Sequence, residues 1–137
     1  MRGERAPSPR ARLAPIFANT RPFVTFCGTV SASALARLLS PATRLVSLAS
    51  PQNPSDVAIP RTVLAEVLSV IQARCPDALL LLDETYRCAV YGDDVLVPSA
   101  ATMSPNVVVT GSLSKCHGVP GVRIGWAIAG NARPFLE

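Results

Sequence analysis

The sequence predicts an α/β domain with a mostly parallel sheet and flanking helices. Short, uniformly apolar runs are separated by segments with helical periodicity, a pattern typical of strands that are covered on both faces and connected by helices. The chain has 137 residues and is 49% hydrophobic, which is enough for one domain with a sizeable core.

The first half of this pattern lies between residues 33 and 56. Apolar residues three and four apart predict a short helix over 33–39, ended by Pro41. Residues 44–48 are expected to form a strand. The turn formers that crowd 50–56 then predict a loop.

The second half contains the longer elements. A helix is expected from Pro60, a residue that a first helical turn tolerates, to about Arg74. The runs 78–82 and 106–110 predict central strands of a parallel sheet, buried on both faces. The run 122–129 predicts a third such strand, reached through a loop that contains glycine and proline.

The charge of the chain is low and uneven. Charged residues make up 16% of the sequence, against about 25% in a usual soluble domain. The net charge is +4, but residues 1–44 hold seven arginines and one acidic residue, so the basic character belongs to the N-terminal third. No apolar run approaches the roughly 18 residues of a membrane span, so no membrane partner is expected.

Residues 1–30 are expected to form a flexible basic segment, because most of this stretch is rich in Pro, Arg and Ala and shows no periodicity. An organelle transit peptide is one alternative. A nucleic-acid-binding arm is disfavoured, since no aromatic residues alternate with the arginines. The N-terminus lacks the apolar region of a secretory signal, so a cytoplasmic location is expected.

The cysteines do not indicate a metal site. Cys27, Cys75, Cys88 and Cys116 lack the paired spacing of zinc ligands, and His117 is the only histidine. We therefore expect no metal, and reduced cysteines with a structural role.

Asp83 is the first candidate site residue. It directly follows the apolar run 78–82, at the carboxyl end of a buried strand, where open α/β sheets bind their ligands. A carboxylate in such a position needs a cation or hydrogen-bond donors facing it. The alternative is an ordinary aspartate that caps the following turn.

Lys115 is the second candidate and the only lysine in the chain. It follows the strand predicted to end at Thr110, and a lysine beside a dry sheet edge can act as an imine-forming nucleophile. Nearby hydroxyls and glycines would let a phosphate approach, and Arg123 offers a planar fork that suits phosphate. The alternative is a solvated lysine and a surface arginine.

Three motifs together carry a resemblance. Ser-Pro-Gln-Asn-Pro stands at 50–54, Asp-Glu-Thr-Tyr at 83–86, and Ser-Leu-Ser-Lys at 112–115 with Gly-Val-Arg-Ile-Gly-Trp at 121–126. In this order and spacing they resemble the pyridoxal-phosphate (PLP) dependent class I/II aminotransferases of the fold-type-I superfamily. The resemblance covers residues about 31–131, so 31–137 would be a partial, PLP-binding large domain.

The resemblance implies a role for each site residue. Lys115 would bind PLP through a Schiff base and later carry a proton to and from the substrate Cα, while Asp83 would pair with the protonated pyridine nitrogen. The other implied contacts are those of the ring's phenolic oxygen with Asn53 and Tyr86, and of the cofactor phosphate with Ser112, Ser114 and Arg123. Arg87 has no implied role and is expected at the surface.

The loop motif departs from the family pattern Asn-Pro-x-Asn-Pro-Thr-Gly. Ser50, Ser55 and Asp56 replace its first, sixth and seventh residues, whereas Asn53 is retained. Asp56 stands where the family has glycine, and aspartate tolerates a positive φ better than most residues.

The implied reaction is amino-group transfer from an amino acid to a 2-oxo acid, in a family that is usually homodimeric. Two alternatives remain open. One is a catalytically incompetent fragment whose exposed sheet edges favour aggregation. The other is a non-enzymatic, PLP-binding regulatory module. The same motifs are also compatible with other PLP reactions, such as decarboxylation or β-elimination.

Overall fold

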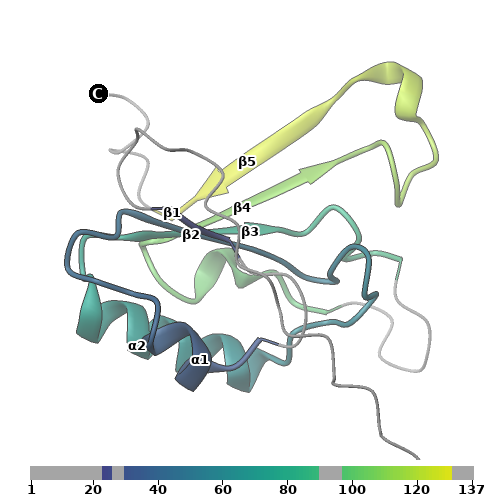
Figure 1. Cartoon of the computed structure of the whole chain (residues 1–137). Coiled ribbons are helices and arrows are strands. Elements are labelled where there is room, and N and C mark those ends of the chain that lie inside the picture. Colours follow the sequence, from purple (N-terminus) through teal and green to yellow (C-terminus); the bar gives the residue numbers. More distant parts are fainter. Residues whose placement is uncertain (1–22, 26–29, 90–96, 131–137) are drawn as a thin grey trace, which may run out of the picture.

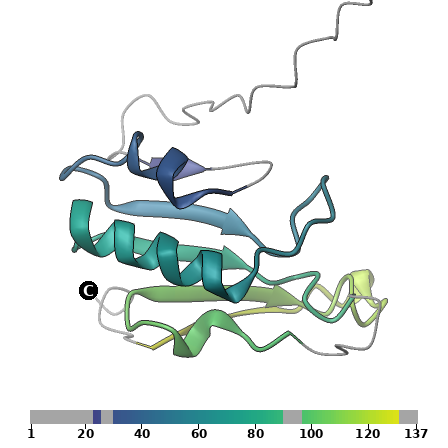
Figure 2. The same cartoon turned by 90° about the horizontal axis from the view of Figure 1, so that it is seen from below.

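A computed structural model describes residues 23–25, 30–89 and 97–130 (Figure 1). These residues form a five-stranded sheet, and two helices lie against one of its faces (Figure 2). The strands follow one another in the sheet in chain order: β1 (Phe23–Thr25), β2 (Leu45–Ala49), β3 (Leu79–Asp83), β4 (Val107–Ser112) and β5 (Gly125–Ala129). The helices are α1 (Ala32–Ala36) and α2 (Arg61–Arg74), with short 3₁₀ turns η1 (Ala100–Thr102) and η2 (Pro120–Val122).

The prediction of an α/β fold with a mostly parallel sheet is confirmed, because β1 to β4 all run parallel. The expected central strands and both helices are present within a few residues of their predicted bounds. Ser31 begins α1 by accepting the Ala34 N–H at 3.1 Å, which satisfies a donor of the first turn. Pro60 stands directly before α2, as its fixed φ allows.

The final strand differs from the prediction. A third central parallel strand was expected over 122–129, but β5 begins at Gly125, runs antiparallel to β4 and is exposed along most of its length. The connection from β4 contains only η2 and has no helix to carry the chain back to the start of β4. A parallel pair needs such a crossover, whereas an antiparallel pair needs only a reversal.

The strand β1 was not expected. It lies within residues 1–30, the predicted flexible segment, and Phe23 to Thr25 pair in parallel with Leu45 to Ser47. Residues 1–22 and 26–29 lie outside the described part of the chain.

The core lies between the sheet and the helices. Alternate strand residues face the helices in two rows, Val46 with Leu80 and Val107, then Leu48 with Leu82 and Val109. The helices contribute Leu35, Leu64, Val67 and Ile71, and each such buried side chain contributes about 1.5–3 kcal/mol. On the opposite face Leu79 and Leu81 of β3 are only half-buried, so the expectation of a strand buried on both faces is wrong for β3. It is confirmed for β4, where the consecutive residues Val107, Val108 and Val109 are all buried. None of the helices in this part of the chain is long and apolar enough to cross a membrane.

A glycine in β4 makes room for the only tryptophan. Gly111 pairs with Trp126 of β5, and a Cβ at position 111 would lie 2.7 Å from two atoms of the indole ring. The indole therefore lies directly over backbone that carries no side chain.

We expect Gly111→Ala to displace the indole and to lower the free energy of unfolding by about 1–2 kcal/mol, measured by urea denaturation. Because the clash needs both side chains, the same change in a Trp126→Ala background should cost clearly less. Equal losses in the two backgrounds would contradict this packing.

The buried Cys75 at the end of α2 gives a pH prediction. Burial raises the pKa of the Cys75 thiol, and the charge of Arg44 offsets part of that rise. The folded state thus favours the neutral Cys75 thiol. The stability that this preference contributes is fully present at a pH below the thiol pKa of the unfolded chain, and it is lost as the pH rises through the higher thiol pKa of the folded chain. Above about pH 8.5 we expect Cys75→Ala to lose stability less steeply than the parent chain, measured by urea denaturation across pH. A Cys75→Ala slope equal to that of the parent chain would contradict this role of the buried thiol.

Candidate functional site

The predicted site residues gather at one edge of the sheet. Ala49, Asp83 and Thr110 are aligned across β2, β3 and β4, so these parallel strands end together. Their tips point to the same side in Figure 2. We call this side the carboxyl edge; it comprises the loops 50–56, 83–87 and 112–124. The antiparallel β5 starts there, because Gly125 pairs with Ser112.

Asp83 ends β3 with an exposed side chain, so the expected desolvated position is wrong for the described residues. Its Oδ1 accepts hydrogen bonds from the Thr85 N–H at 3.0 Å, the Thr85 hydroxyl at 2.6 Å and the Thr110 hydroxyl at 3.4 Å. Asp83 therefore caps the following turn through Oδ1, as an ordinary aspartate in this position would. Oδ2 accepts no hydrogen bond from the described residues and is available to an external cation.

Lys115 and Tyr86 meet across two loops. The Lys115 Nζ lies 5.9 Å from the centre of the Tyr86 ring, within the range of a cation–π interaction. The lysine is exposed and the tyrosine half-buried. The Gly118 N–H donates to the Lys115 carbonyl at 3.1 Å, and the Ser114 N–H donates to Ser112 Oγ at 3.4 Å. The lysine is therefore solvent-exposed but held in a folded loop.

Arg123 occupies an unusual backbone position. Its φ is 57°, in the left-handed region that costs energy for a side chain of this size. The side chain is exposed, and Nη1 donates to the Pro120 carbonyl at 3.1 Å. Its position two residues before Gly125 keeps it at the carboxyl edge, near the serines of the β4 loop.

Asn53 is exposed in the loop after β2. The loop closes on itself through the Asp56 N–H, which donates to the Gln52 carbonyl at 2.8 Å. Asp56 has a φ of 58°, so the aspartate adopts the conformation expected of the glycine it replaces. The Ser50 N–H donates to the Asp83 carbonyl at 2.9 Å, which joins this loop to the end of β3.

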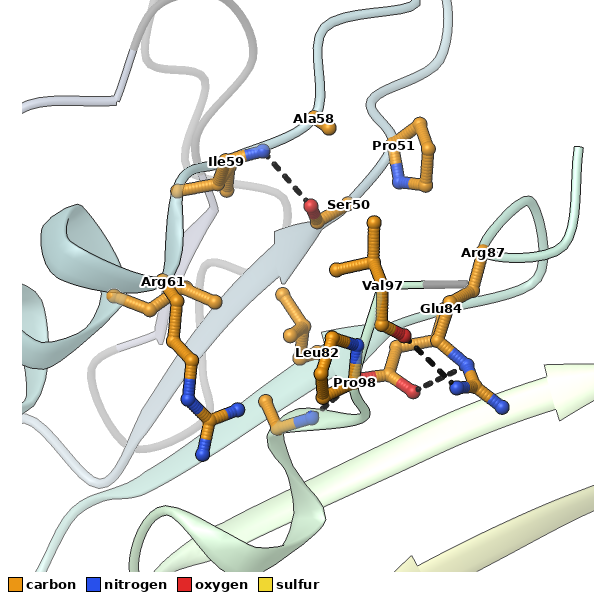
Figure 3. A pocket seen from close by; sticks show the side chains of 12 residues that line it. Ser50, Pro51, Ala58, Ile59, Arg61, Leu82, Glu84, Arg87, Val97 and Pro98 are labelled. Carbon is orange, nitrogen blue, oxygen red and sulfur yellow. Dashed lines mark hydrogen bonds and ion pairs between the residues drawn. The ribbon is translucent and has the colours of Figure 1, made fainter. Parts of the chain in front are cut away.

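Glu84 and Arg87 form an ion pair that the sequence analysis did not predict (Figure 3). The Glu84 carboxylate accepts the Ala100 N–H at 2.7 Å and lies 3.3 Å from Arg87 Nε. Arg87 Nη1 also donates to the Val97 carbonyl at 3.0 Å. The expectation of a surface Arg87 is therefore wrong: its side chain is 28% exposed and that of Glu84 only 9%. The i, i+3 spacing of opposite charges is the signal that would have indicated the pair.

The cavities near the carboxyl edge are small. One, between α2 and the Glu84–Arg87 pair, holds about 20 Å³ (Figure 3). Another, lined by residues including Thr85, Cys116 and Trp126, holds about 80 Å³. Cofactor pockets usually measure about 300–1,000 Å³, so the described residues offer a cofactor an open surface. They hold no group of three side chains suited to a metal ion.

The sequence matches the family model of aminotransferase class I and II over residues 19–135. This chain belongs to the class I/II aminotransferases. The match is longer than the resemblance carried by the motifs, since it begins before residue 31 and includes β1.

Individual relatives match this aminotransferase chain over a similar stretch. Histidinol-phosphate aminotransferase of Roseobacter denitrificans is 39% identical over 101 residues, which are 74% of this chain and 27% of that protein. Arginine–pyruvate transaminase AruH of Pseudomonas aeruginosa is 33% identical over 100 residues, 72% of this chain and 25% of that protein. The crystal structure of a PLP-dependent aminotransferase from Streptococcus suis superposes with a TM-score of 0.67 at 30% identity, covering 77% of this chain and 26% of the other. This aminotransferase chain thus spans about a quarter of the length of the curated relatives it matches.

The strained backbone of Arg123 leads to a prediction in which stability and binding change in opposite directions. Arg123→Gly should remove the left-handed strain and leave the free energy of unfolding unchanged or up to about 1 kcal/mol higher. The resemblance implies that Arg123 contacts the cofactor phosphate, and under that role the loss of its planar cation should weaken PLP binding at least about tenfold. Urea denaturation and equilibrium dialysis measure the two effects. A marked loss of stability would show that the arginine supports the fold instead.

Proposed function

We propose that this chain binds PLP at the carboxyl edge, with Lys115 forming the covalent attachment, and that it serves amino-group transfer from an amino acid to a 2-oxo acid. The observation that carries this proposal is the meeting of Lys115 and Tyr86 at 5.9 Å, at the same edge of the sheet as Asp83. Membership of the aminotransferase family supports the same cofactor and reaction class.

The donor set suits this cofactor. The lysine offers an amine to an aldehyde, and the aspartate offers a carboxylate oxygen to a protonated ring nitrogen. Arg123 offers a planar cation to a phosphate dianion. Ser112 and Ser114 add hydroxyl donors in the same loop. Asn53 and Tyr86 would serve the phenolic oxygen of the ring.

When bound, PLP supplies an electron sink for the charge that develops at the substrate Cα. Asp83 would keep the proton on the ring nitrogen through Oδ2. The Lys115 amine, released when the substrate amine takes its place, would accept a proton from the substrate Cα and return it. The cap that Thr85 and Thr110 place on Oδ1 fixes the orientation of the Asp83 carboxylate.

PLP binding without turnover is a second candidate. Asp83, Lys115 and Arg123 are all exposed, and the nearby cavities are too small to enclose a cofactor. An open surface binds a cofactor but does not exclude water from the reacting atoms, which most cofactor enzymes require.

The test uses the fact that Lys115 is the only lysine. Added PLP should produce a visible absorbance band, and borohydride reduction followed by peptide mass spectrometry should locate the cofactor on Lys115. Lys115→Ala leaves the N-terminal amine as the matched control and should lose the band. A band of equal strength in Lys115→Ala would refute the proposed attachment.

The two candidate functions separate in a second step. A panel of amino acids is added to the PLP-loaded chain, followed by assay of the 2-oxo acid formed. A 2-oxo acid produced by the parent chain and absent with Lys115→Ala indicates transfer. A stable band without any 2-oxo acid indicates binding alone.

A further inference from the structure

The turn formed by residues 84–87 carries Tyr86 and is tied down on both sides. Within the turn, the Arg87 N–H donates to the Glu84 carbonyl at 2.9 Å. On one side the Glu84 carboxylate accepts the Ala100 N–H at 2.7 Å, in a site where only 9% of its side chain is exposed. Arg87 neutralises this carboxylate at 3.3 Å and also donates to the Val97 carbonyl at 3.0 Å (Figure 3).

The other side of the turn is tied to the lysine loop. The Cys116 thiol donates to the Thr85 carbonyl at 3.0 Å, and Cys116 is half-buried. Thr85 directly precedes Tyr86, and Cys116 directly follows Lys115. This hydrogen bond therefore joins the neighbours of the two residues that meet at 5.9 Å.

We propose that Glu84 and Cys116 are positioning residues that together hold the Tyr86 ring over the Lys115 amine. Glu84 fixes the turn against η1 and Cys116 fixes it against the loop of Lys115. Neither side chain needs to touch a cofactor. The consequence for cofactor chemistry rests on the proposed function, whereas the arrangement of ring and amine does not.

Two features indicate that Glu84 and Cys116 position the turn and do more than fill space in the packing. The thiol bonds a main-chain carbonyl outside the strands, so it adds nothing to the sheet ladder. The Glu84 side chain spans sixteen positions of sequence to reach Ala100, and its charge is matched by Arg87 within the turn itself. A nearly buried carboxylate that is paired and hydrogen-bonded has a defined orientation, which a lone surface acid lacks.

The experiment labels the single lysine of the cofactor-free chain with an amine-acylating reagent, and mass spectrometry separates Lys115 from the N-terminus. The cation–π contact holds the amine against the ring, so releasing the ring should free the amine and speed labelling. A cation–π contact at an exposed site corresponds to an increase of about two- to fivefold. We expect this increase in Cys116→Ala, and a rate near that of the parent in Cys116→Ser, whose hydroxyl still donates.

Matched variants test the route of the effect. Cys88→Ala removes an exposed thiol of the same region and should leave the rate unchanged. In a Tyr86→Leu background, Cys116→Ala should have no further effect, because the ring through which it acts is gone. A Cys116→Ser rate equal to that of Cys116→Ala, or additive effects with Tyr86→Leu, would overturn the proposal.

The Glu84 side has its own pair of variants. Glu84→Ala should raise the labelling rate, and Glu84→Gln should raise it less, because the amide oxygen still accepts the Ala100 N–H. Circular dichroism checks that each variant folds. If Glu84→Ala does not fold, the double variant Glu84→Gln with Cys116→Ala tests the role of Glu84 instead. Its labelling rate should exceed that of Cys116→Ala alone. A rate equal to Cys116→Ala would remove Glu84 from the proposal.

A final measurement separates this inference from the proposed function. With PLP added, the pH titration of the visible band should shift in Cys116→Ala and return in Cys116→Ser. Labelling rates that change as expected, in a chain that binds no PLP, would support the positioning role and refute the proposed function. If PLP gives its band, but every variant keeps the labelling rate and the band titration of the parent chain, the positioning role is refuted and the proposed function is not.

Discussion

The in-register parallel alignment of β2, β3 and β4 determines where every candidate site residue lies. Successive residues of a strand point to opposite faces, so Leu82 enters the core only if Asp83 points to the other side. A slip of one residue would bury the carboxylate and expose the leucine, and the loss of apolar burial opposes such a slip. The hydrophobic core on the helix-covered face of the sheet thus determines which way the Asp83 carboxylate points, although Asp83 is not part of that core.

In the loops of the carboxyl edge, backbone turns and local hydrogen bonds position the candidate site residues. The Asp56 and Arg123 backbones are both left-handed, and each lies in a loop that carries a candidate cofactor contact. Residues in such conformations persist where the surrounding structure fixes them, and they concentrate at ligand sites. The loops after β2 and β4 each contain one such residue, and Asp83, Lys115 and Arg123 at the same edge are exposed to solvent. This combination suits recognition of a cofactor better than enclosure of a substrate.

The sequence predicted the elements whose signal is local. The apolar runs of β3 and β4 and the periodic stripe of α2 are readable without knowledge of their neighbours, and so is the order of the three loop motifs. The direction of β5 was not readable, because it depends on how η2 and the left-handed Arg123 reverse the chain. The exposure of Asp83 depends on what covers a sheet face, and the bond from Glu84 to Ala100 joins residues far apart in sequence. Contacts between residues far apart in the sequence leave no periodic pattern in it, so they could not be predicted.

The antiparallel β5 has a consequence for the lifetime of the chain. The Leu113 N–H donates to the Ile124 carbonyl, so the alternate residues Gly125, Ala127 and Ala129 direct their backbone groups away from β4. The strand carries no charge or proline, and Trp126 is 42% and Ile128 49% exposed. Native proteins usually protect such an edge, because any extended segment can add to it as a further strand. Among the described residues no strand pairs with this outer edge of β5, so the rate of encounter with other strands is a factor in the survival of the chain beside its free energy of unfolding.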